Sequence, residues 1–150
     1  MKVIKVIYIA IVLTLLGISI PVSVQAQKTD LKWHIFEEAL QLAEETGKPI
    51  MVDVWAPWCG WCKKMEKEVY PEISANFHED FILTRLNRDD NESRKKYKHV
   101  SLTPLRLSQK LNVQQVPAIV MLSPEGEYLF HLSGFTEAEK LKEILGYVVE

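Results

Sequence analysis

The stretch "IMVDVWAPWCGWCKKM" (residues 50–65) contains the only two cysteines of the 150-residue chain, Cys59 and Cys62. Its first half is mostly apolar, which predicts a strand over residues 50–56, and its second half predicts a helix that begins at the cysteines. Three kinds of site would explain two cysteines at this spacing: a structural disulfide, half of a metal site, or a reactive dithiol that exchanges electrons with other thiols. The residues around the pair favour the third.

The spacing of the two cysteines suits a disulfide that opens and closes reversibly. One helical turn brings positions i and i+3 onto one face, about 5–6 Å apart, which matches the Cα separation of disulfides. Cys59 should lie at the helix N-terminus, where the helix dipole and free backbone amides favour a thiolate. Cys62, one turn further, should be more buried and less acidic. We therefore predict a redox-active Cys59–Cys62 disulfide in which Cys59 is the attacking nucleophile and Cys62 resolves the mixed disulfide.

The other two explanations agree less well with the sequence. A closed zinc site needs four ligands, and none of the four histidines has the spacing that would complete a site with the cysteines; they are His34, His78, His99 and His131. Covalent haem attachment needs a histidine directly after the second cysteine, and residue 63 is lysine. A structural disulfide would close a loop too short to stabilise the fold much. No metal and no other cofactor is therefore expected.

Asp53 stands in the middle of the predicted strand, among apolar residues. Burial of a carboxylate is unfavourable unless the group stays neutral or is paired. A buried carboxyl with a raised pKa would accept the proton of Cys62 when that thiol attacks the mixed disulfide. This interpretation requires a strand that is buried on both faces, because Val52 and Val54 point away from Asp53. The alternative is a surface-facing aspartate on an edge strand.

The N-terminal residues have the organisation of a secretory signal. Two lysines precede an uncharged apolar run over residues 6–20, and a short polar segment follows. Ala26 completes a small-x-small cleavage site, so we predict that residues 1–26 are a signal peptide and that residues 27–150 form the mature domain in the periplasm, or otherwise outside the cytoplasm. An uncleaved membrane anchor is the alternative, because the run is nearly as long as the roughly 20 residues that span a bilayer.

The composition of the mature part argues against nucleic-acid binding. Removal of the signal takes away two lysines and no acids, which leaves 16 basic and 20 acidic side chains and a net charge of −4. Nucleic-acid-binding domains carry clustered lysine and arginine, whereas the one basic run here, residues 93–99, suits a solvated helix face. A domain of this size buries a core of its own, and we expect it to be a monomer.

The remaining segments predict an α/β fold with the element order α-β-α-β-α-β-β-α. A helix is expected from its N-cap Asp30 to Gly47, the helix that begins at the cysteines is expected to end near Tyr70-Pro71, and residues 88–100 are expected to form a loop or a short helical insertion. The other predicted elements are a strand over residues 81–87, a helix over 103–112 capped by Thr103, a hairpin that turns at 124–127, and a C-terminal helix over 136–149.

Three separated motifs resemble those of the thioredoxin family. "VDVWAPWCGWCKKM" (52–65) resembles the active-site stretch, "TRLNRD" (84–89) the strand that follows, and "LNVQQVPAIVMLSPEGE" (111–127) the segment with the family's cis-proline. The resemblance extends over about residues 31–148. It implies a thioredoxin fold: a central mixed β-sheet flanked by helices, with a terminal antiparallel hairpin and a C-terminal helix. It also puts Arg85 where a lysine usually assists the buried aspartate. Within the family, the chain is similar to secreted modules such as the C-terminal domain of DsbD-type thiol:disulfide interchange proteins.

The resemblance further implies how a substrate is bound. Pro117 would be the cis-proline, and the backbone of Val116 would pair with an extended substrate segment that lies across Cys59. The tryptophans that flank the nucleophile would form an exposed apolar rim. An ordinary trans proline, and core packing of the tryptophans, are the alternatives. The expected substrate-binding residues are Trp58, Gly60, Trp61, Val116 and Pro117.

These features predict an enzyme, a thiol–disulfide oxidoreductase that reduces the disulfides of protein partners and contributes to redox homeostasis. A membrane electron donor of the DsbD or CcdA type would re-reduce it. The dipeptide between the cysteines is Gly-Trp, which differs from the Gly-Pro of thioredoxin and from the Pro-His or Gly-His of oxidases and isomerases, and this leaves the partner and the redox direction open. A disulfide oxidase or isomerase is one alternative, and a non-catalytic, chaperone-like binding module is another.

Overall fold

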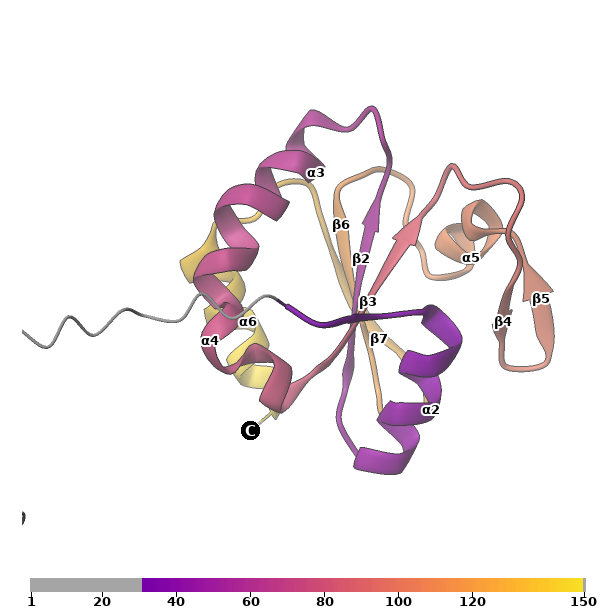
Figure 1. The fold of residues 1–150 in the computed structure, drawn as a ribbon, viewed down its shortest axis with the longest axis horizontal. Helices are drawn as coiled ribbons and strands as arrows, with labels where there is room; N and C mark the ends of the chain where they lie inside the picture. The colour runs from indigo at the N-terminus through magenta and orange to yellow at the C-terminus, as the bar shows by residue number, and fades with distance from the viewer. Residues whose placement is uncertain (1–30, 150) are drawn as a thin grey trace, which may run out of the picture.

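A five-stranded sheet forms the centre of the domain (Figure 1). The computed structural model describes residues 31–149, and their side chains except those of residues 74–78. The strand order is β1-β3-β2-β6-β7, with β1, β3 and β2 parallel and with β6 and β7 antiparallel to their neighbours. The sheet strands are β1 (Trp33–His34), β2 (Ile50–Trp55), β3 (Ile82–Asn87), β6 (Ala118–Leu122) and β7 (Tyr128–Ser133).

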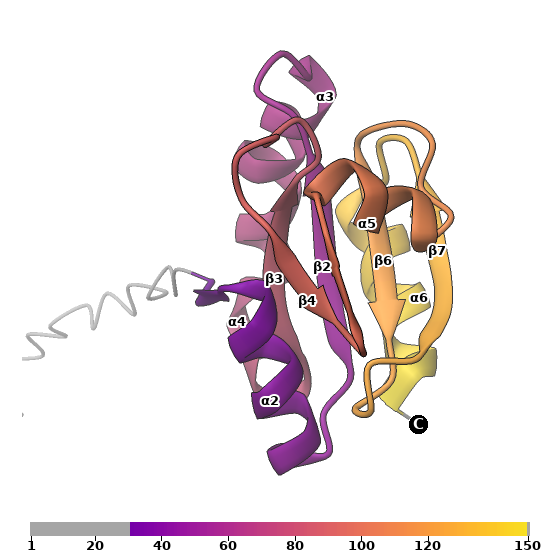
Figure 2. The ribbon, with the colours of Figure 1, turned by 90° about the vertical axis from the view of Figure 1, so that its right-hand side faces the viewer.

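Helices cover both faces of this sheet, as Figure 1 shows. On the face that Figure 2 looks onto, α2 (Phe36–Thr46) and α5 (Pro104–Lys110) bury the side chains of alternate β2 residues, Ile50, Val52 and Val54. On the other face lies a continuous helical run, with α6 beside it. The elements on this face are α3 (Gly60–Lys64), the π-helical turn η1 (Met65–Val69), α4 (Tyr70–Asp80) and α6 (Ala138–Val149). The predicted fold class is confirmed: β2 is a central strand buried on both faces.

Several predicted elements are confirmed. Strands β2 and β3 lie within one residue of their predicted ranges, and β6 and β7 form the predicted hairpin around residues 124–127. Helix α5 begins where the sequence indicates, because the side chain of Thr103 accepts a hydrogen bond from the backbone N–H of Arg106 and Pro104 occupies the first helical position. Gly47 ends α2 in the left-handed conformation, at φ 69°.

The first predicted helix begins later than expected. Asp30 lies outside the described residues, and α2 starts at Phe36 after an exposed Ile35 that provides no side-chain cap. The two residues of β1 pair instead in parallel with Leu83 and Thr84 of β3. The backbone groups of β1, which a longer helix would have paired internally, therefore form their hydrogen bonds with the edge of β3.

The helix that begins at the cysteines does not end near Tyr70-Pro71, as predicted, but continues to Asp80. Proline lacks an N–H, and its ring clashes with the carbonyl four residues earlier in a regular α-helix. Here the wide turn η1 precedes Pro71, and the backbone N–H of Tyr70 bonds to the carbonyl of Met65, five residues back. The π-turn therefore accommodates the proline within the helix.

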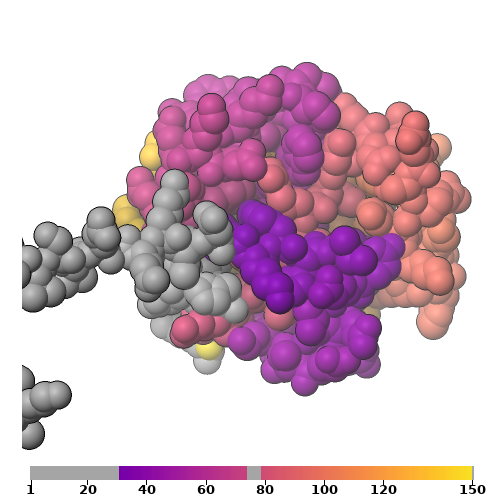
Figure 3. Space-filling model, in the orientation of Figure 1, coloured from indigo at the N-terminus to yellow at the C-terminus, as the bar shows by residue number. Residues whose placement is uncertain are grey.

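Residues 88–100 were expected to form a loop or a short helix; this prediction is confirmed for residues 88–94, which form a loop, and wrong for the residues that follow. The segment contributes most of a separate antiparallel hairpin, β4 (Lys95–Tyr97) and β5 (Val100–Leu102), which lies beside α2 (Figures 1 and 3). Tyr97 anchors the hairpin: its ring packs on Phe36 and its hydroxyl donates to the carbonyl of Gly126. Lys98 takes the turn position at φ 54°, which glycine or asparagine more often occupies, so the sequence carries no strong turn signal.

The predicted signal, residues 1–26, lies outside the described residues. Within residues 31–149 no helix is both long enough and apolar enough to cross a lipid bilayer.

A candidate dithiol active site

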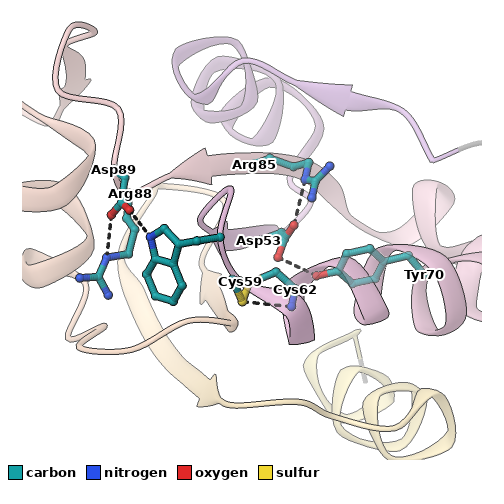
Figure 4. The surroundings of a disulfide bond; sticks show 8 residues. Asp53, Cys59, Cys62, Tyr70, Arg85, Arg88 and Asp89 are labelled. Atoms are coloured by element: carbon teal, nitrogen blue, oxygen red, sulfur yellow. Dashed lines mark hydrogen bonds and ion pairs between the residues drawn. A yellow bond between two sulfur atoms is a disulfide. The ribbon is translucent and has the colours of Figure 1, made fainter.

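Cys59 and Cys62 lie where β2 gives way to the helical run, and they form a disulfide (Figure 4). Their Cα atoms are 5.3 Å apart. Cys59 is the N-cap of α3, and its Sγ accepts a hydrogen bond of 3.0 Å from the backbone N–H of Cys62. A backbone amide and the positive end of a helix dipole are therefore directed at Cys59 Sγ, and both stabilise negative charge on this sulfur.

The two cysteines do not differ in burial as the sequence suggested. Each is 4% exposed, although Cys62 was expected to be the more buried of the two. Both belong to a small apolar cluster with Ala56, against which Trp55 and Val116 pack. This cover shields Cys59 as well as Cys62 in the disulfide form, so the distinction between the two sulfurs rests on helix position and not on exposure.

An exposed aromatic rim lies next to the disulfide. Trp58 is 66% exposed and Trp61 58% exposed, whereas Trp55 on the strand is partly buried. The ring of Trp61 packs against Phe135, with centroids 5.3 Å apart, and Lys64 Nζ lies over both rings. These contacts hold an apolar surface open to solvent, of the kind that marks an interaction site.

Trp58 is held by residues that the sequence did not identify. Its indole Nε1 donates a hydrogen bond to Oδ2 of Asp89, just after β3. Arg88 forms an ion pair with Asp89 (Figure 4) and donates through Nη1 to the carbonyl of Gln114. Asp89 lies in the "TRLNRD" motif, but nothing in the sequence indicates that it meets a residue 31 positions earlier.

The segment before β6 approaches the disulfide from the other side. The Val116–Pro117 peptide bond is cis, and the Val116 side chain packs against the cysteine cluster. The carbonyl of Pro117 accepts a hydrogen bond from the N–H of Gly134, which has φ 87°. The structure thus brings together the five residues expected to bind substrate, two tryptophans and Gly60 from the α3 region and Val116 with Pro117 from this segment.

Asp53 is 2% exposed and lies on the face of β2 that the α3–α4 run covers. The edge-strand alternative is therefore excluded. Its Oδ1 accepts a hydrogen bond of 2.7 Å from the hydroxyl of Tyr70, and its Oδ2 accepts one of 2.9 Å from Arg85 Nε (Figure 4). Burial raises the pKa of Asp53 above its usual 3.8, although the positive charge of Arg85 and the two hydrogen bonds act in the opposite direction.

Arg85 connects this buried carboxylate to the surface. Its Nη1 bonds at 2.8 Å to Glu66 Oε1, which is exposed, and its guanidinium lies over the rings of Trp33 and Trp55. The resemblance placed Arg85 correctly beside Asp53, but Glu66 and Tyr70 were not expected. Tyr70 was not predicted to belong to the site because the helix was predicted to end there.

No group of three or more histidine, cysteine or acidic residues within the described part of the chain is arranged to hold a metal ion. The reactive groups that the described residues bring together here include the two cysteines and the carboxyl of Asp53.

Comparison with known proteins agrees with this geometry. The profile of the thioredoxin-like domain matches residues 36–149. The chain belongs to the thioredoxin-like family. A thioredoxin-related protein of Chlamydia pneumoniae, DsbJ, is 26% identical over an alignment of 145 residues that covers 91% of this chain and 41% of the relative. The thiol:disulfide interchange protein DsbD of Photorhabdus laumondii is 25% identical over 120 residues, 77% of this chain and 19% of the relative. The chain therefore spans less than half the length of both relatives.

Solved structures share the thioredoxin-like fold. The oxidoreductase DsbH superposes with a TM-score of 0.63 at 16% identity, covering 89% of this chain and 96% of that one. A thioredoxin from Thermus thermophilus superposes with a TM-score of 0.65 at 23% identity, covering 80% of this chain and 88% of that one. At such identities the likeness concerns the fold alone, and within it this thioredoxin-like chain carries a close cysteine pair suited to thiol–disulfide exchange.

Proposed function

We propose that this thioredoxin-like protein reduces disulfides of partner proteins outside the cytoplasm. One arrangement supports this most directly: Cys59 caps the helix and its sulfur accepts a hydrogen bond from the backbone N–H of Cys62, while a buried carboxylate lies under the same helix. A purely structural disulfide would need neither feature. The relationship to proteins named DsbJ and DsbD supports the same class of reaction.

The reaction proceeds through two exchanges that balance in atoms and electrons. In the reduced protein, the Cys59 thiolate attacks one sulfur of the partner disulfide, which forms a mixed disulfide and releases the other partner sulfur as a thiolate. Cys62 then loses its proton to Asp53 and attacks the Cys59 sulfur. This second step forms the Cys59–Cys62 disulfide and releases the partner's remaining sulfur. The partner gains two electrons, and the protein loses two.

The partner binds through backbone and apolar contacts around the disulfide. The backbone at Val116 pairs with an extended segment of the partner, as in strand addition, and Pro117 holds that edge next to the cysteines. The indoles of Trp58 and Trp61 contact apolar side chains of the same segment, and Gly60 leaves room for its backbone. This mode of binding suits unfolded or extended protein substrates and does not need a deep pocket.

A redox titration tests this function and its direction. Equilibration of the purified domain with dithiol buffers gives the reduction potential of the Cys59–Cys62 pair. We expect a value close to the roughly −270 mV of thioredoxin, whereas a value close to the roughly −120 mV of a strong oxidant would assign the oxidase alternative. Stoichiometric reduced protein should also reduce insulin in a single turnover. A dithiol that stays inert toward insulin would indicate the non-catalytic module.

The location outside the cytoplasm follows from the proposed signal peptide, residues 1–26, and requires re-reduction by a membrane donor of the DsbD or CcdA type. N-terminal sequencing of material exported by a bacterial host should begin at Gln27. Recovery of a chain that starts at Met1 from the membrane fraction would establish the anchored alternative. Loss of the donor in that host should leave the exported protein oxidised.

A further inference from the structure

Tyr70 reaches Asp53 because of the π-turn in the helix between them and the cysteines. Successive residues of a regular α-helix are about 100° apart, so position 70 would lie about 80° around the helix from Cys62, eight residues earlier. The π-turn η1 takes up one extra residue, which turns the following helix back by about 100° and brings Tyr70 to within about 20° of the Cys62 face. The wide turn therefore directs Tyr70 toward the sheet under the disulfide.

The contacts of Tyr70 fix it in this place. Its side chain is buried, its ring packs edge-on against Trp33 with centroids 5.5 Å apart, and its hydroxyl donates to Asp53 Oδ1. Arg85 occupies the other carboxylate oxygen. Each carboxylate oxygen of Asp53 thus accepts one hydrogen bond, one from a donor on α4 and the other from a donor on β3.

We propose that Tyr70 is a positioning residue that orients the Asp53 carboxylate and favours its ionised form, and that the π-turn η1 directs Tyr70 toward this carboxylate. The inference rests on the proposed function, in which Asp53 takes the proton of Cys62. Tyr70 reaches the reacting sulfurs only through Asp53, so it is not itself a catalytic residue.

The charged and titratable groups that act on Asp53 come from three elements. Arg85 of β3 and the Tyr70 hydroxyl favour the ionised carboxylate, and Glu66 of η1 opposes it. The neighbouring position on β6 is Ile119, which is apolar. Burial and the adjacent carboxylate raise the pKa of Tyr70 well above its ordinary value, so this hydroxyl remains a donor through the neutral range. Its loss should therefore raise the pKa of Asp53.

Tyr70→Phe tests the proposal because phenylalanine keeps the ring against Trp33 and removes only the hydroxyl. Tyr97→Phe is the matched control: Tyr97 is also buried and also donates its hydroxyl, but to the carbonyl of Gly126, away from the site. Both variants lose one buried hydrogen bond and should lose comparable stability. Only Tyr70→Phe should affect the titration of Asp53.

Two readouts separate this inference from the proposed function. In the oxidised protein, carbon-13 NMR of the Asp53 carboxyl should show a titration displaced to higher pH in Tyr70→Phe and unchanged in Tyr97→Phe. In single-turnover reduction of insulin, Tyr70→Phe should release the partner about two- to tenfold more slowly than the parent at pH values below the pKa of Asp53, which is the range expected for the loss of one hydrogen bond. Above that pKa the two rates of release should be equal.

The outcomes are distinct. A parental Asp53 titration together with a parental pH profile in Tyr70→Phe would overturn the role of Tyr70, even if stability falls. Equal displacement in Tyr97→Phe would also overturn it, because the effect would then come from general loosening. A parent protein that does not reduce insulin would instead contradict the proposed function, while the NMR titration would still decide whether Tyr70 controls Asp53.

Discussion

The indole Nε1 of Trp58 donates a hydrogen bond of 2.5 Å to Oδ2 of Asp89, 31 positions further along the chain. Asp89 also pairs with Arg88, and Arg88 bonds to the carbonyl of Gln114, two residues before Val116. One polar chain therefore links the exposed aromatic rim to the backbone segment that we propose binds the partner. An exposed tryptophan held in this way offers contact area with little loss of conformational entropy on binding.

Asp89→Ala should weaken reduction of protein disulfides without unfolding the domain. The freed Trp58 must be ordered at each binding event, so KM for insulin should rise several-fold, about 0.5–1.5 kcal/mol for one immobilised side chain. Reduction of a small disulfide such as oxidised glutathione should be unchanged. Asp89→Asn, which keeps an acceptor oxygen, is the control and should stay near the parent. Equal losses on both substrates would show that Asp89 acts on the cysteines and not through Trp58.

Cys62→Ser should trap mixed disulfides, and Cys59→Ser should not. The reason is the helix N-terminus at Cys59, because both sulfurs are buried to the same extent in the disulfide form. After incubation of each reduced variant with insulin, non-reducing gels and mass spectrometry should show an insulin adduct on Cys59 alone. Brief alkylation of the reduced parent should label the same residue. Preferential labelling of Cys62 would reverse the assignment of nucleophile and resolving cysteine.

The sequence predicted the core of the site well because its determinants are local or strongly patterned. The position of the cysteines between strand and helix, and the apolar run around Asp53, follow from periodicity. The capping of α5 by Thr103 followed from a short motif in the same way. The burial of Asp53 on a central strand was predicted only conditionally, since it depended on helices that cover both faces of the sheet.

The missed features depend on tertiary contacts that leave no local signal. Pro71 is a reliable helix breaker by itself, and only the π-turn before it lets the helix continue and carry Tyr70 to Asp53. The hairpin of β4 and β5 turns at a lysine with positive φ, so turn chemistry did not reveal it. The partnership of Trp58 with Asp89 joins segments brought together only by the parallel pairing of β2 and β3.

Gly60→Ala should separate partner binding from folding. Gly60 is exposed at the first position of α3, its φ is not in the left-handed region, and an added Cβ would meet no atom of the protein within 4 Å. Alanine should therefore leave the free energy of unfolding unchanged or raise it by up to about 1 kcal/mol, as expected from helix propensity. If a partner backbone passes over Gly60, insulin reduction should slow while reduction of oxidised glutathione should not. Parental rates with both substrates would remove Gly60 from the binding surface.

Substitution of Asp53 should separate its contribution to stability from its part in the reaction. Asp53→Asn keeps an acceptor for the Tyr70 hydroxyl, and Arg85 keeps Glu66 as a partner, so loss of the buried charge should leave the fold at least as stable at neutral pH. Asp53→Ala leaves the Tyr70 hydroxyl without its acceptor and should be about 1–3 kcal/mol less stable than Asp53→Asn. Addition of Tyr70→Phe to Asp53→Ala should recover part of that difference.

The difference in stability between Asp53→Asn and the parent should depend on pH. The pKa of Asp53 is raised, so the folded protein binds this proton more tightly than the unfolded chain, and ionisation of Asp53 destabilises the fold. The free energy of unfolding of the parent should therefore fall as pH rises from the ordinary carboxyl pKa of 3.8 through the raised value. Asparagine does not titrate, so the stability advantage of Asp53→Asn should grow over that window and then stay constant. Denaturant midpoints between about pH 3 and pH 8 measure this difference in stability.

In single-turnover reduction, Asp53→Asn should form the mixed disulfide at close to the parental rate and release the partner more slowly, since Cys62 lacks its proton acceptor. A variant that is less stable than the parent but releases the partner at the parental rate would make Asp53 a structural residue.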